Sequence, residues 1–335
     1  MDNATKPLAP HAIYEMAANY FMIARTIQVA AELDIFTPLA RQASTAAELA
    51  QAIKSNVRGI EMLLVACTAL GLLDKQGDRY RTSAAAHAML VQGEPGYAGH
   101  LLAGSVGVYQ DWLKLDEAVR TGQPVARPSR EKDAESLRQF VIGMHLSSQT
   151  VARFVANNLD LRDKKKVVDV GGGAGAFAIA LCQQYPQLTA TVLDLPEVTA
   201  IAQEVIAQAG LAQRIRTRST DYVRDPIPLG HDVVLFCNVL HQEDAETVQL
   251  LLQKAYSALN GRGSVVILDV LLNETKTGPL SVALGALNNL IHNRGGEVHS
   301  GEELQSWLRK AGFGAAKLMA LPFPDLSLLT AVKTK

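Results

Sequence analysis

The chain has 335 residues, of which 48% are apolar, enough to bury the core of more than one domain. Its 32 basic and 33 acidic residues leave a formal net charge of −1, which argues against nucleic acid or an anionic membrane as partner, because binding phosphates requires clustered lysine and arginine. Nothing in the sequence has the length of a membrane span or the pattern of a signal peptide. The three cysteines are widely separated, so we expect a cytoplasmic protein with neither disulfides nor a metal site.

The N-terminal half of the chain is predicted to be mainly helical. Residues 14–36 repeat apolar side chains at helical spacing, and Thr45 and Glu48 predict a capping box that opens a second helix. Residues 59–73 are apolar almost all round, which predicts a buried third helix, and residues 72–82 are typical of a hairpin. Three helices and a hairpin follow the order of a winged helix. The apolar face of the first helix would consist of Met16, Tyr20, Ile23, Ile27, Ala30 and Ala31.

A winged helix raises the alternative of a DNA-binding ligand sensor. A recognition helix brings basic or amide side chains to the groove, whereas residues 58–71 are almost wholly aliphatic. Such a surface fits contact with protein better, so we expect a dimer interface. A helical subdomain that only covers the second half of the chain is the other interpretation.

From residue 161 the pattern changes to alternating strands and helices, which predicts an α/β fold with a mostly parallel, Rossmann-like sheet. Ligands of such sheets bind at the carboxyl ends of the strands, near the point where the strand order reverses. Seven strands are expected, at residues 166–170, 189–195, 214–219, 232–238, 264–270, 316–321 and 326–334.

A glycine turn follows the first of these strands. Gly171, Gly172 and Gly173 permit a sharp bend and close approach of the backbone to a ligand, and the helix that follows offers free N–H groups. Asp194 ends the second strand, where a carboxylate can accept hydrogen bonds from ribose hydroxyls. The pattern predicts a nucleoside cofactor, although the same glycine spacing also satisfies the dinucleotide fingerprint of a nicotinamide dehydrogenase.

Asp169 helps to separate these two cofactors. It lies two residues before the first glycine, so a pyrophosphate at the turn would meet a like charge, whereas a ligand with an ammonium and a sulfonium would be attracted. S-adenosylmethionine is such a ligand. The alternative is that Asp169 only accepts backbone N–H groups within the turn. After the third strand, Asp221 and Tyr222 are placed to meet the adenine, although Asp is also common in loops.

Several segments resemble successive motifs of the class I S-adenosylmethionine-dependent O-methyltransferases, in particular the dimeric small-molecule type. They are VVDVGGGAG, LDLPEV, STDYVRDPIP, the run from DVVLFCN to YSAL, GRGSVVILDVLLNE and HNRGGEVHSGEELQSWLRKAGF. In the helical half, AAELDIFTPL, STAAELAQAI and residues 63–83 resemble the winged-helix dimerisation domain of that family. The resemblance implies a homodimer and S-adenosylmethionine as cofactor, with S-adenosylhomocysteine as product and no metal. It also implies dimerisation through residues 1–95, a helical linker at 96–160 that contributes to the substrate pocket, and catalysis in 161–335.

The resemblance also implies a catalytic base. The family carries a histidine after the fourth strand, here His241, and a carboxylate at the end of the fifth, here Asp269. A neutral imidazole at a strand end can take a phenolic proton, which supports the assignment from the residue itself. The alternative is that His241 caps a helix or a loop. Of the competing histidines, His231 precedes its strand and points to the wrong end of the sheet, while His299 stays open.

The sequence departs from the family at four places. Gln242 and Glu243 replace the usual Asp-Trp pair, and Val298 stands where a second carboxylate is usual. Either Glu297 substitutes for that carboxylate or its role is empty. Cys237 replaces a common lysine near the cofactor, where the amide of neighbouring Asn238 would serve instead.

The resemblance finally implies residues near the two small molecules. Leu195 would lie at the cofactor, and Met144, Asn288 and His292 would line the acceptor pocket, although Met144 would equally suit a core. Trp112 fits either the pocket wall or the core. The expected reaction is methylation of a hydroxyl on a small, aromatic or conjugated acceptor. Methylation at carbon or nitrogen, or a relative that binds the cofactor without methylating, are the alternatives within the fold.

Overall fold

The computed structural model describes residues 9–94, 96–99, 102, 106–126 and 134–334. The chain divides into two compact units, residues 1–110 and residues 111–335, and each is described by itself. The division falls inside the stretch 96–160 that was predicted as a linker. The predicted boundary at residue 95 lies outside the described residues.

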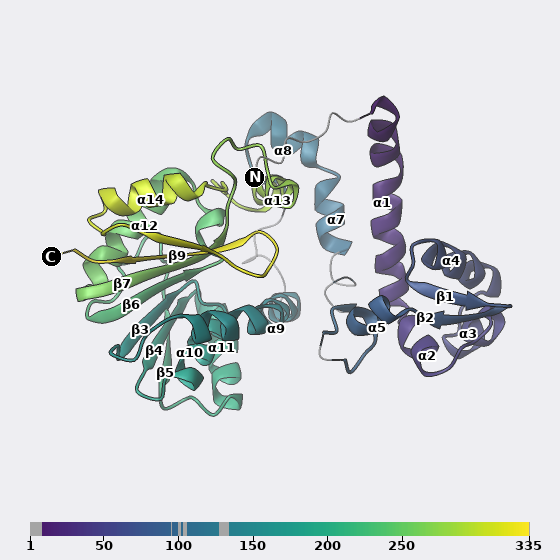
Figure 1. Ribbon diagram of the computed structural model, residues 1–335, viewed down its shortest axis with the longest axis horizontal. Coiled ribbons are helices and arrows are strands. Elements are labelled where there is room, and N and C mark those ends of the chain that lie inside the picture. Colours follow the sequence, from purple (N-terminus) through teal and green to yellow (C-terminus); the bar gives the residue numbers. More distant parts are fainter. Residues whose placement is uncertain (1–8, 95, 100–101, 103–105, 127–133, 335) are drawn as a thin grey trace. The chain divides into compact units, whose positions relative to one another are not determined.

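The first unit contains the long helix α1 together with shorter helices and a β-hairpin (Figure 1). Thr45 and Glu48 form the predicted capping box, and the predicted hairpin is confirmed. Its core packs Phe36, Leu64 and Tyr80 together, each almost fully buried. The elements are α1 (Pro10–Glu32), α2 (Phe36–Arg41), α3 (Ala46–Ala52), α4 (Val57–Ala69), β1 (Leu73–Gln76), β2 (Arg79–Thr82) and α5 (Ala84–Leu90), with α7 (Val106–Trp112) crossing the boundary between the units.

Two helices of this unit leave apolar faces uncovered. The prediction that the third helix would be buried is wrong for the single chain, because α4 buries only one stripe and exposes Met62 and Val65. The predicted apolar face of α1 is likewise covered only near its end, where Ala30 is buried while Tyr20 stays 60% exposed. The physical reason is that a helix with apolar side chains on several faces needs packing partners on all of those faces. The described part of this unit covers only one face of each helix.

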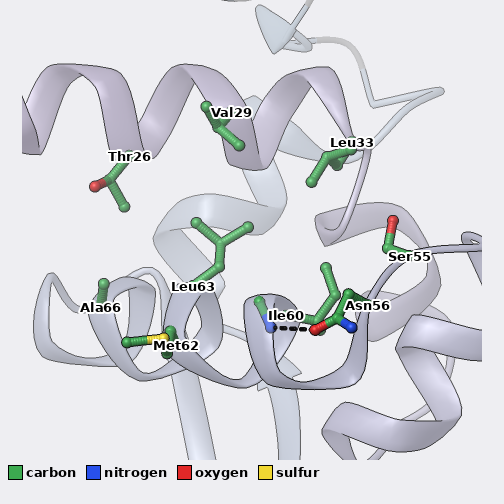
Figure 2. A pocket seen from close by; sticks show the side chains of 10 residues that line it. Thr26, Val29, Leu33, Ser55, Asn56, Ile60, Met62, Leu63 and Ala66 are labelled. Carbon is green, nitrogen blue, oxygen red and sulfur yellow. Dashed lines mark hydrogen bonds between the residues drawn. The ribbon is translucent and has the colours of Figure 1, made fainter.

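A groove runs between α1 and α4, with a volume of about 440 Å³ (Figure 2). Leu63 points from α4 toward α1, where Val29 and Leu33 lie opposite (Figure 2). Because most of its lining is apolar, leaving the groove in water is unfavourable. The groove is lined by Thr26, Val29, Leu33, Ser55, Asn56, Gly59, Ile60, Met62, Leu63 and Ala66.

The second unit is built on a seven-stranded sheet in the order β5-β4-β3-β6-β7-β9-β8. The first five strands in this order are parallel, and β9 runs antiparallel to both of its neighbours, β7 and β8. This topology confirms the predicted Rossmann-like fold. The strands are β3 (Lys166–Val170), β4 (Thr189–Asp194), β5 (Ile215–Ser219), β6 (His231–Cys237), β7 (Leu259–Val270), β8 (Lys317–Ala320) and β9 (Leu326–Val332).

Helices cover both faces of this sheet (Figure 1). One apolar layer joins the sheet to α9, α10 and α11, and a second joins it to α12 and α14. Within the described ranges, no helix has the length and apolar character needed to cross a membrane. The helices are α8 (Leu115–Thr121), α9 (Ala134–Asn158), α10 (Ala176–Gln184), α11 (Pro196–Gln208), α12 (Ala245–Ala258), α13 (Leu280–His292) and α14 (Gly301–Lys310), with a short 3₁₀ helix, η2 (Leu240–Gln242).

The parallel strands bring distant residues to one edge of the sheet. Val170 at the end of β3 pairs with Leu193 of β4 and with Phe236 of β6. Leu268 near the end of β7 pairs with Cys237. The predicted site residues that follow or end these strands therefore converge at the carboxyl edge, where ligands of such sheets bind.

Candidate active site

The turn after β3 is shaped by its glycines. Gly171 and Gly173 have φ angles of +65° and +56°, in the left-handed region that a residue with a Cβ rarely adopts. A Cβ on Gly172 would lie 2.7 Å from Cγ of Asp169, so the carboxyl group packs directly under the turn. A Cβ on Gly173 would meet no atom within 4 Å. The turn is therefore closed on its inner side and open at Gly173, as a backbone that approaches a ligand must be.

Asp169 is a fully buried carboxyl group with weak hydrogen bonding. Its exposed fraction is 0%, neither oxygen accepts a hydrogen bond of normal geometry from the described residues, and the one nearby donor is the amide of Ala178. Burial raises the pKa of Asp169 to about 7, the Ala178 amide lowers it in part, and the charge of Asp194 adds to the rise. An unpaired carboxylate in this position is costly, and a cation bound at the turn would reduce that cost.

Asp194 ties the glycine turn to the end of β4. Its Oδ2 accepts from the Gly173 amide at 2.8 Å, and its Oδ1 accepts from the Leu195 amide, also at 2.8 Å. Burial raises the pKa of Asp194, and these two hydrogen bonds oppose the rise. Each oxygen keeps a further lone pair, so the carboxylate is held in place and can still accept from the hydroxyls of a ribose.

The loop after β5 carries Asp221 and Tyr222. Oδ1 of Asp221 accepts from the amides of Val223 and Arg224 at 3.1 and 3.3 Å. One oxygen of this carboxylate therefore stabilises the turn that begins at Asp221. Tyr222 lies beside the glycine turn, because a Cβ on Gly171 would be 3.5 Å from its ring atom Cε1. Tyr222 thus stands next to the glycine turn, and the role of the two residues at a nucleoside stays a prediction.

His241 and Asp269 form a hydrogen-bonded pair at the ends of β6 and β7. Nδ1 of His241 lies 2.5 Å from Oδ1 of Asp269, and the His241 amide donates to Oδ2 at 3.2 Å. Asp269 is buried, whereas the imidazole is 21% exposed. Burial alone would lower the pKa of His241, but the charge and hydrogen bond of Asp269 outweigh it and raise this pKa. With Nδ1–H directed at Asp269, Nε2 carries the lone pair of the neutral ring.

Asn289 on α13 also holds His241, a contact that sequence reasoning missed. Its Nδ2 donates to the carbonyl oxygen of His241 at 2.7 Å, and the asparagine is buried. Asn238, at the end of β6, adopts a left-handed φ of +57°, and its carbonyl accepts from Nε2 of Gln242 at 2.9 Å. The short segment that bears the imidazole is therefore fixed from both sides.

The other histidines and carboxylates near this edge have different partners. Nδ1 of His231, at the start of β6, contacts the carbonyl of Pro228, away from the site. His299 is buried, and its Nε2 donates to the carbonyl of Glu243 at 3.1 Å. Glu297 is exposed and Val298 buried, so the partner of the His241 ring is Asp269 rather than Glu297.

Asn288 and His292 lie one turn apart on α13 and both have polar partners. Trp112 Nε1 donates to Oδ1 of Asn288 at 3.0 Å. The ring of His292 contacts Oδ2 of Asp111 through Nε2 at 3.2 Å and the Asn288 carbonyl through Nδ1 at 2.8 Å. Asp111 was not anticipated from the sequence. Met144, the third residue expected at the acceptor, lies on α9 with 44% exposure.

A metal centre has no counterpart in the described part of the chain. No group of three or more His, Cys, Asp or Glu residues there is arranged to hold a metal ion.

Comparison with known proteins agrees with this geometry. A model of the O-methyltransferase domain matches residues 113–314, and one of the O-methyltransferase dimerisation domain matches residues 16–92. A 3-hydroxy-5-methyl-1-naphthoate 3-O-methyltransferase of Streptomyces sahachiroi is 39% identical over 90% of this chain and 88% of its own. The N,N-dimethyltransferase OxyT of Streptomyces rimosus is 31% identical over 92% and 93%. The structure of human N-acetylserotonin methyltransferase in complex with SAM superposes with a TM-score of 0.86 at 25% identity, over all of both chains.

Proposed function

The chain belongs to the O-methyltransferase family, and from this we propose that it transfers a methyl group from S-adenosylmethionine to a hydroxyl of a small aromatic molecule. The observation that carries the proposal is the His241–Asp269 pair at the same edge of the sheet as the open glycine turn. A base and a nucleoside site on one edge are what methyl transfer to a hydroxyl requires.

The residues of the glycine turn fit the proposed cofactor. The turn and Asp194 would hold the nucleoside, with Leu195, Tyr222, Asp221 and Asn238 around it. The unpaired carboxyl of Asp169 would favour a positively charged ligand over a pyrophosphate. S-adenosylmethionine, when bound, supplies an electrophilic methyl group on a sulfonium.

His241 would act as the general base. Its Nδ1–H is engaged by Asp269, which leaves Nε2 to accept the proton of the acceptor hydroxyl. The oxygen would keep the electron pair of the broken O–H bond and form a bond to the methyl carbon. The electron pair of the methyl–sulfur bond would stay on sulfur, so S-adenosylhomocysteine would be the leaving group. Asp269 stabilises the imidazolium that results, and Asn289 keeps the segment in place through the carbonyl of His241.

The acceptor would lie along α13. Asn288 and His292 present an amide and an imidazole on one face of this helix, already oriented by Trp112 and Asp111. Partly exposed polar groups that are held by neighbours are suited to binding the oxygens of an aromatic acceptor. The named activity of the 39% identical relative makes hydroxynaphthoates the first acceptors to test.

Methylation at nitrogen is the second candidate, because OxyT is named an N,N-dimethyltransferase and aligns over nearly the whole chain. The base distinguishes the two reactions. A neutral amine attacks with its own lone pair, whereas a phenol gains from removal of its proton, and the paired His241 therefore favours oxygen.

We further propose a homodimer formed through the first unit. The dimerisation-domain match covers every residue that lines the groove between α1 and α4 (Figure 2), and the uncovered faces of both helices lie in the same region. A second copy would remove these apolar side chains from water. A cytoplasmic location agrees with three buried cysteines that are all free.

A binding and product experiment tests the proposed function. Calorimetry should show that S-adenosylhomocysteine binds and that NAD does not. Incubation with methyl-labelled S-adenosylmethionine and a panel of hydroxynaphthoates and aminonaphthoates should label the hydroxyl compounds, with an O-methyl signal by NMR. Tight NAD binding without S-adenosylhomocysteine binding would overturn the cofactor assignment, and label found only on nitrogen would overturn the assignment of oxygen.

A further inference from the structure

Glu243 and Tyr222 are joined by a hydrogen bond across the carboxyl edge of the sheet. The Tyr222 hydroxyl donates to Oε1 of Glu243 at 2.8 Å. Tyr222 follows β5 and Glu243 follows β6, and the sheet order places β4 and β3 between these two strands. The bond therefore links two loops that are not neighbours in the sheet, and it does so next to Gly171.

Tyr222 is held at its backbone as well as at its hydroxyl. Nζ of Lys254 donates to the carbonyl of Tyr222 at 3.0 Å, and to those of Val223 and Asp225 at 2.7 and 2.8 Å. Burial and the nearby charge of Glu243 raise the pKa of the phenol, which keeps it protonated as the donor. The aromatic ring is thus fixed in one orientation beside the glycine turn.

Glu243 occupies a costly position. Burial raises the pKa of its carboxyl group, and the hydrogen bond from Tyr222 opposes the rise. Among the described residues, no lysine or arginine forms an ion pair with it, and Tyr222 is the hydrogen-bond partner of its side chain. A half-buried carboxylate without a cation costs stability, which favours a specific role for it here.

The backbone of Glu243 belongs to the segment that bears the base. Its amide donates to the Leu240 carbonyl at 3.1 Å, its carbonyl accepts from His299, and it lies two residues after His241. The side chain of Glu243 is therefore attached to the same backbone segment as His241, and hydrogen bonds hold this segment on both sides.

We infer that Glu243 is a positioning residue for the nucleoside: through Tyr222 it fixes one wall of the cofactor site and connects that wall to the segment of His241. The inference rests on the proposed function, because it assumes that a nucleoside occupies the edge at Gly171. This chain has a carboxylate at the position where the resembled family usually has a tryptophan, and the carboxylate accepts a hydrogen bond that a tryptophan side chain could not accept.

A double-mutant cycle on Glu243 and Tyr222 tests this. Glu243→Ala and Tyr222→Phe should each raise the dissociation constant of S-adenosylhomocysteine by about 5- to 20-fold in calorimetry, because each removes the same hydrogen bond. The double variant should bind no more weakly than either single one. Glu243→Gln keeps an acceptor oxygen and should restore most of the affinity. Glu246→Ala, an exposed glutamate on α12, is the matched control and should bind within about twofold of the wild type.

A steady-state measurement separates positioning from a general loss of structure. For Glu243→Gln and Tyr222→Phe, KM for S-adenosylmethionine should follow the binding data and change more than kcat, because the hydrogen bond acts first on the wall of the cofactor site while His241 keeps its own contact with Asp269. Unchanged affinity in Tyr222→Phe and Glu243→Ala, or losses that simply add, would overturn the inference. If Glu243→Ala fails to fold, the affinities of Tyr222→Phe and Glu243→Gln for S-adenosylhomocysteine still test the inference, because only the first variant loses the hydrogen bond. A wild-type protein that binds no S-adenosylhomocysteine would instead refute the proposed function.

Discussion

His241 Nδ1 and Asp269 Oδ1 lie 2.5 Å apart although the two residues are 28 positions apart in the chain. The contact exists because β6 and β7 are parallel neighbours that end at the same edge. The contact fixes the tautomer of the imidazole and leaves Nε2 free to accept a proton. It also raises the pKa of His241.

Replacing His241 by Ala should slow methyl transfer by about 10²- to 10⁴-fold, the range that general base catalysis contributes. The affinity for S-adenosylhomocysteine should change less than about twofold, because the imidazole is separate from the glycine turn and Asp194. Single-turnover rates and calorimetry measure the two quantities. His87→Ala, in the first unit, is a matched control, and an unaltered rate in His241→Ala would remove this residue as the base.

Asp269→Asn should move the acidic limb of the rate–pH profile to lower pH. The wild-type limb reflects His241, whose pKa is raised by the carboxylate, and removal of that charge lets the pKa fall. The neutral base is then present at lower pH, but the plateau rate drops by about 10²-fold because the imidazolium loses its partner. Profiles of kcat/KM between about pH 5 and pH 9 show both effects. A limb that stays in place would mean that another group titrates.

Asp169→Asn should remove a pH dependence of cofactor binding. In the wild type, affinity for S-adenosylmethionine should rise from pH 6 to pH 8, because Asp169 ionises near a pKa of about 7 and then attracts the positive ligand. The variant should show a flat profile over this interval and bind about 5- to 10-fold more weakly at pH 8. Calorimetry at three pH values is sufficient, and a wild-type profile as flat as that of the variant would contradict the assignment.

The same variant should be more stable than the wild type at pH 8. Because the pKa of Asp169 is raised on folding, the folded state binds its proton more tightly than the unfolded chain, and stability falls as pH rises from about 4 to about 7. Asparagine cannot ionise, so the free energy of unfolding should be higher by up to about 4 kcal/mol at pH 8 and little changed at pH 4. Urea denaturation at both pH values measures it, and a variant less stable at pH 8 would show that the carboxylate is well solvated.

Asn289→Ala should lower kcat without weakening cofactor binding. The variant loses the 2.7 Å hydrogen bond to the His241 carbonyl, so the segment that carries the base becomes less well placed. We expect a loss of about 5- to 20-fold in kcat, which corresponds to the free energy of one buried hydrogen bond. Asn157→Ala, exposed on α9, serves as the control. A fall in S-adenosylhomocysteine affinity of the same size would point to a general loss of structure instead.

Met62→Glu should dissociate the homodimer. Met62 is 63% exposed at the groove between α1 and α4, and a buried glutamate there would face an apolar partner surface without a cation. Sedimentation velocity should show dimerisation weakened on the order of 100-fold. Leu229→Glu, at a leucine outside the first unit that is 75% exposed, should leave the dimer intact. A dimer that persists in Met62→Glu would place the interface elsewhere.

The sequence predicts the centre of the sheet well because strands such as β3 and β6 are buried on both faces. Strands such as β3 and β6 read as continuous apolar runs, and a glycine turn or a polar strand end marks where each stops. The predicted start of β7 at residue 264 is wrong, since the strand begins at Leu259. Residues 260–263 contain two glycines, and such a sequence is typical of a turn.

The contacts between distant segments could not be predicted in the same way. His292 and Asp111 are 181 positions apart, and neither residue has a neighbour in sequence that indicates the pairing. The bond of Glu243 to Tyr222 likewise depends on two loops meeting above the sheet. For α4, an apolar pattern showed that several faces would be covered, but it could not show that the chain itself covers only one.

The residues proposed for the methyl donor and those proposed for the acceptor lie on different segments of the second unit. Asp194 and Tyr222 lie at the glycine turn, whereas the amide and imidazole proposed for the acceptor lie on α13 and are oriented from residues 111 and 112. Under this proposal, substitutions in α13 and in those two residues would change which compounds are modified and leave the donor site intact. A chain built in this way can acquire new chemistry for its acceptor by exchanging one helix and the short segment that braces it.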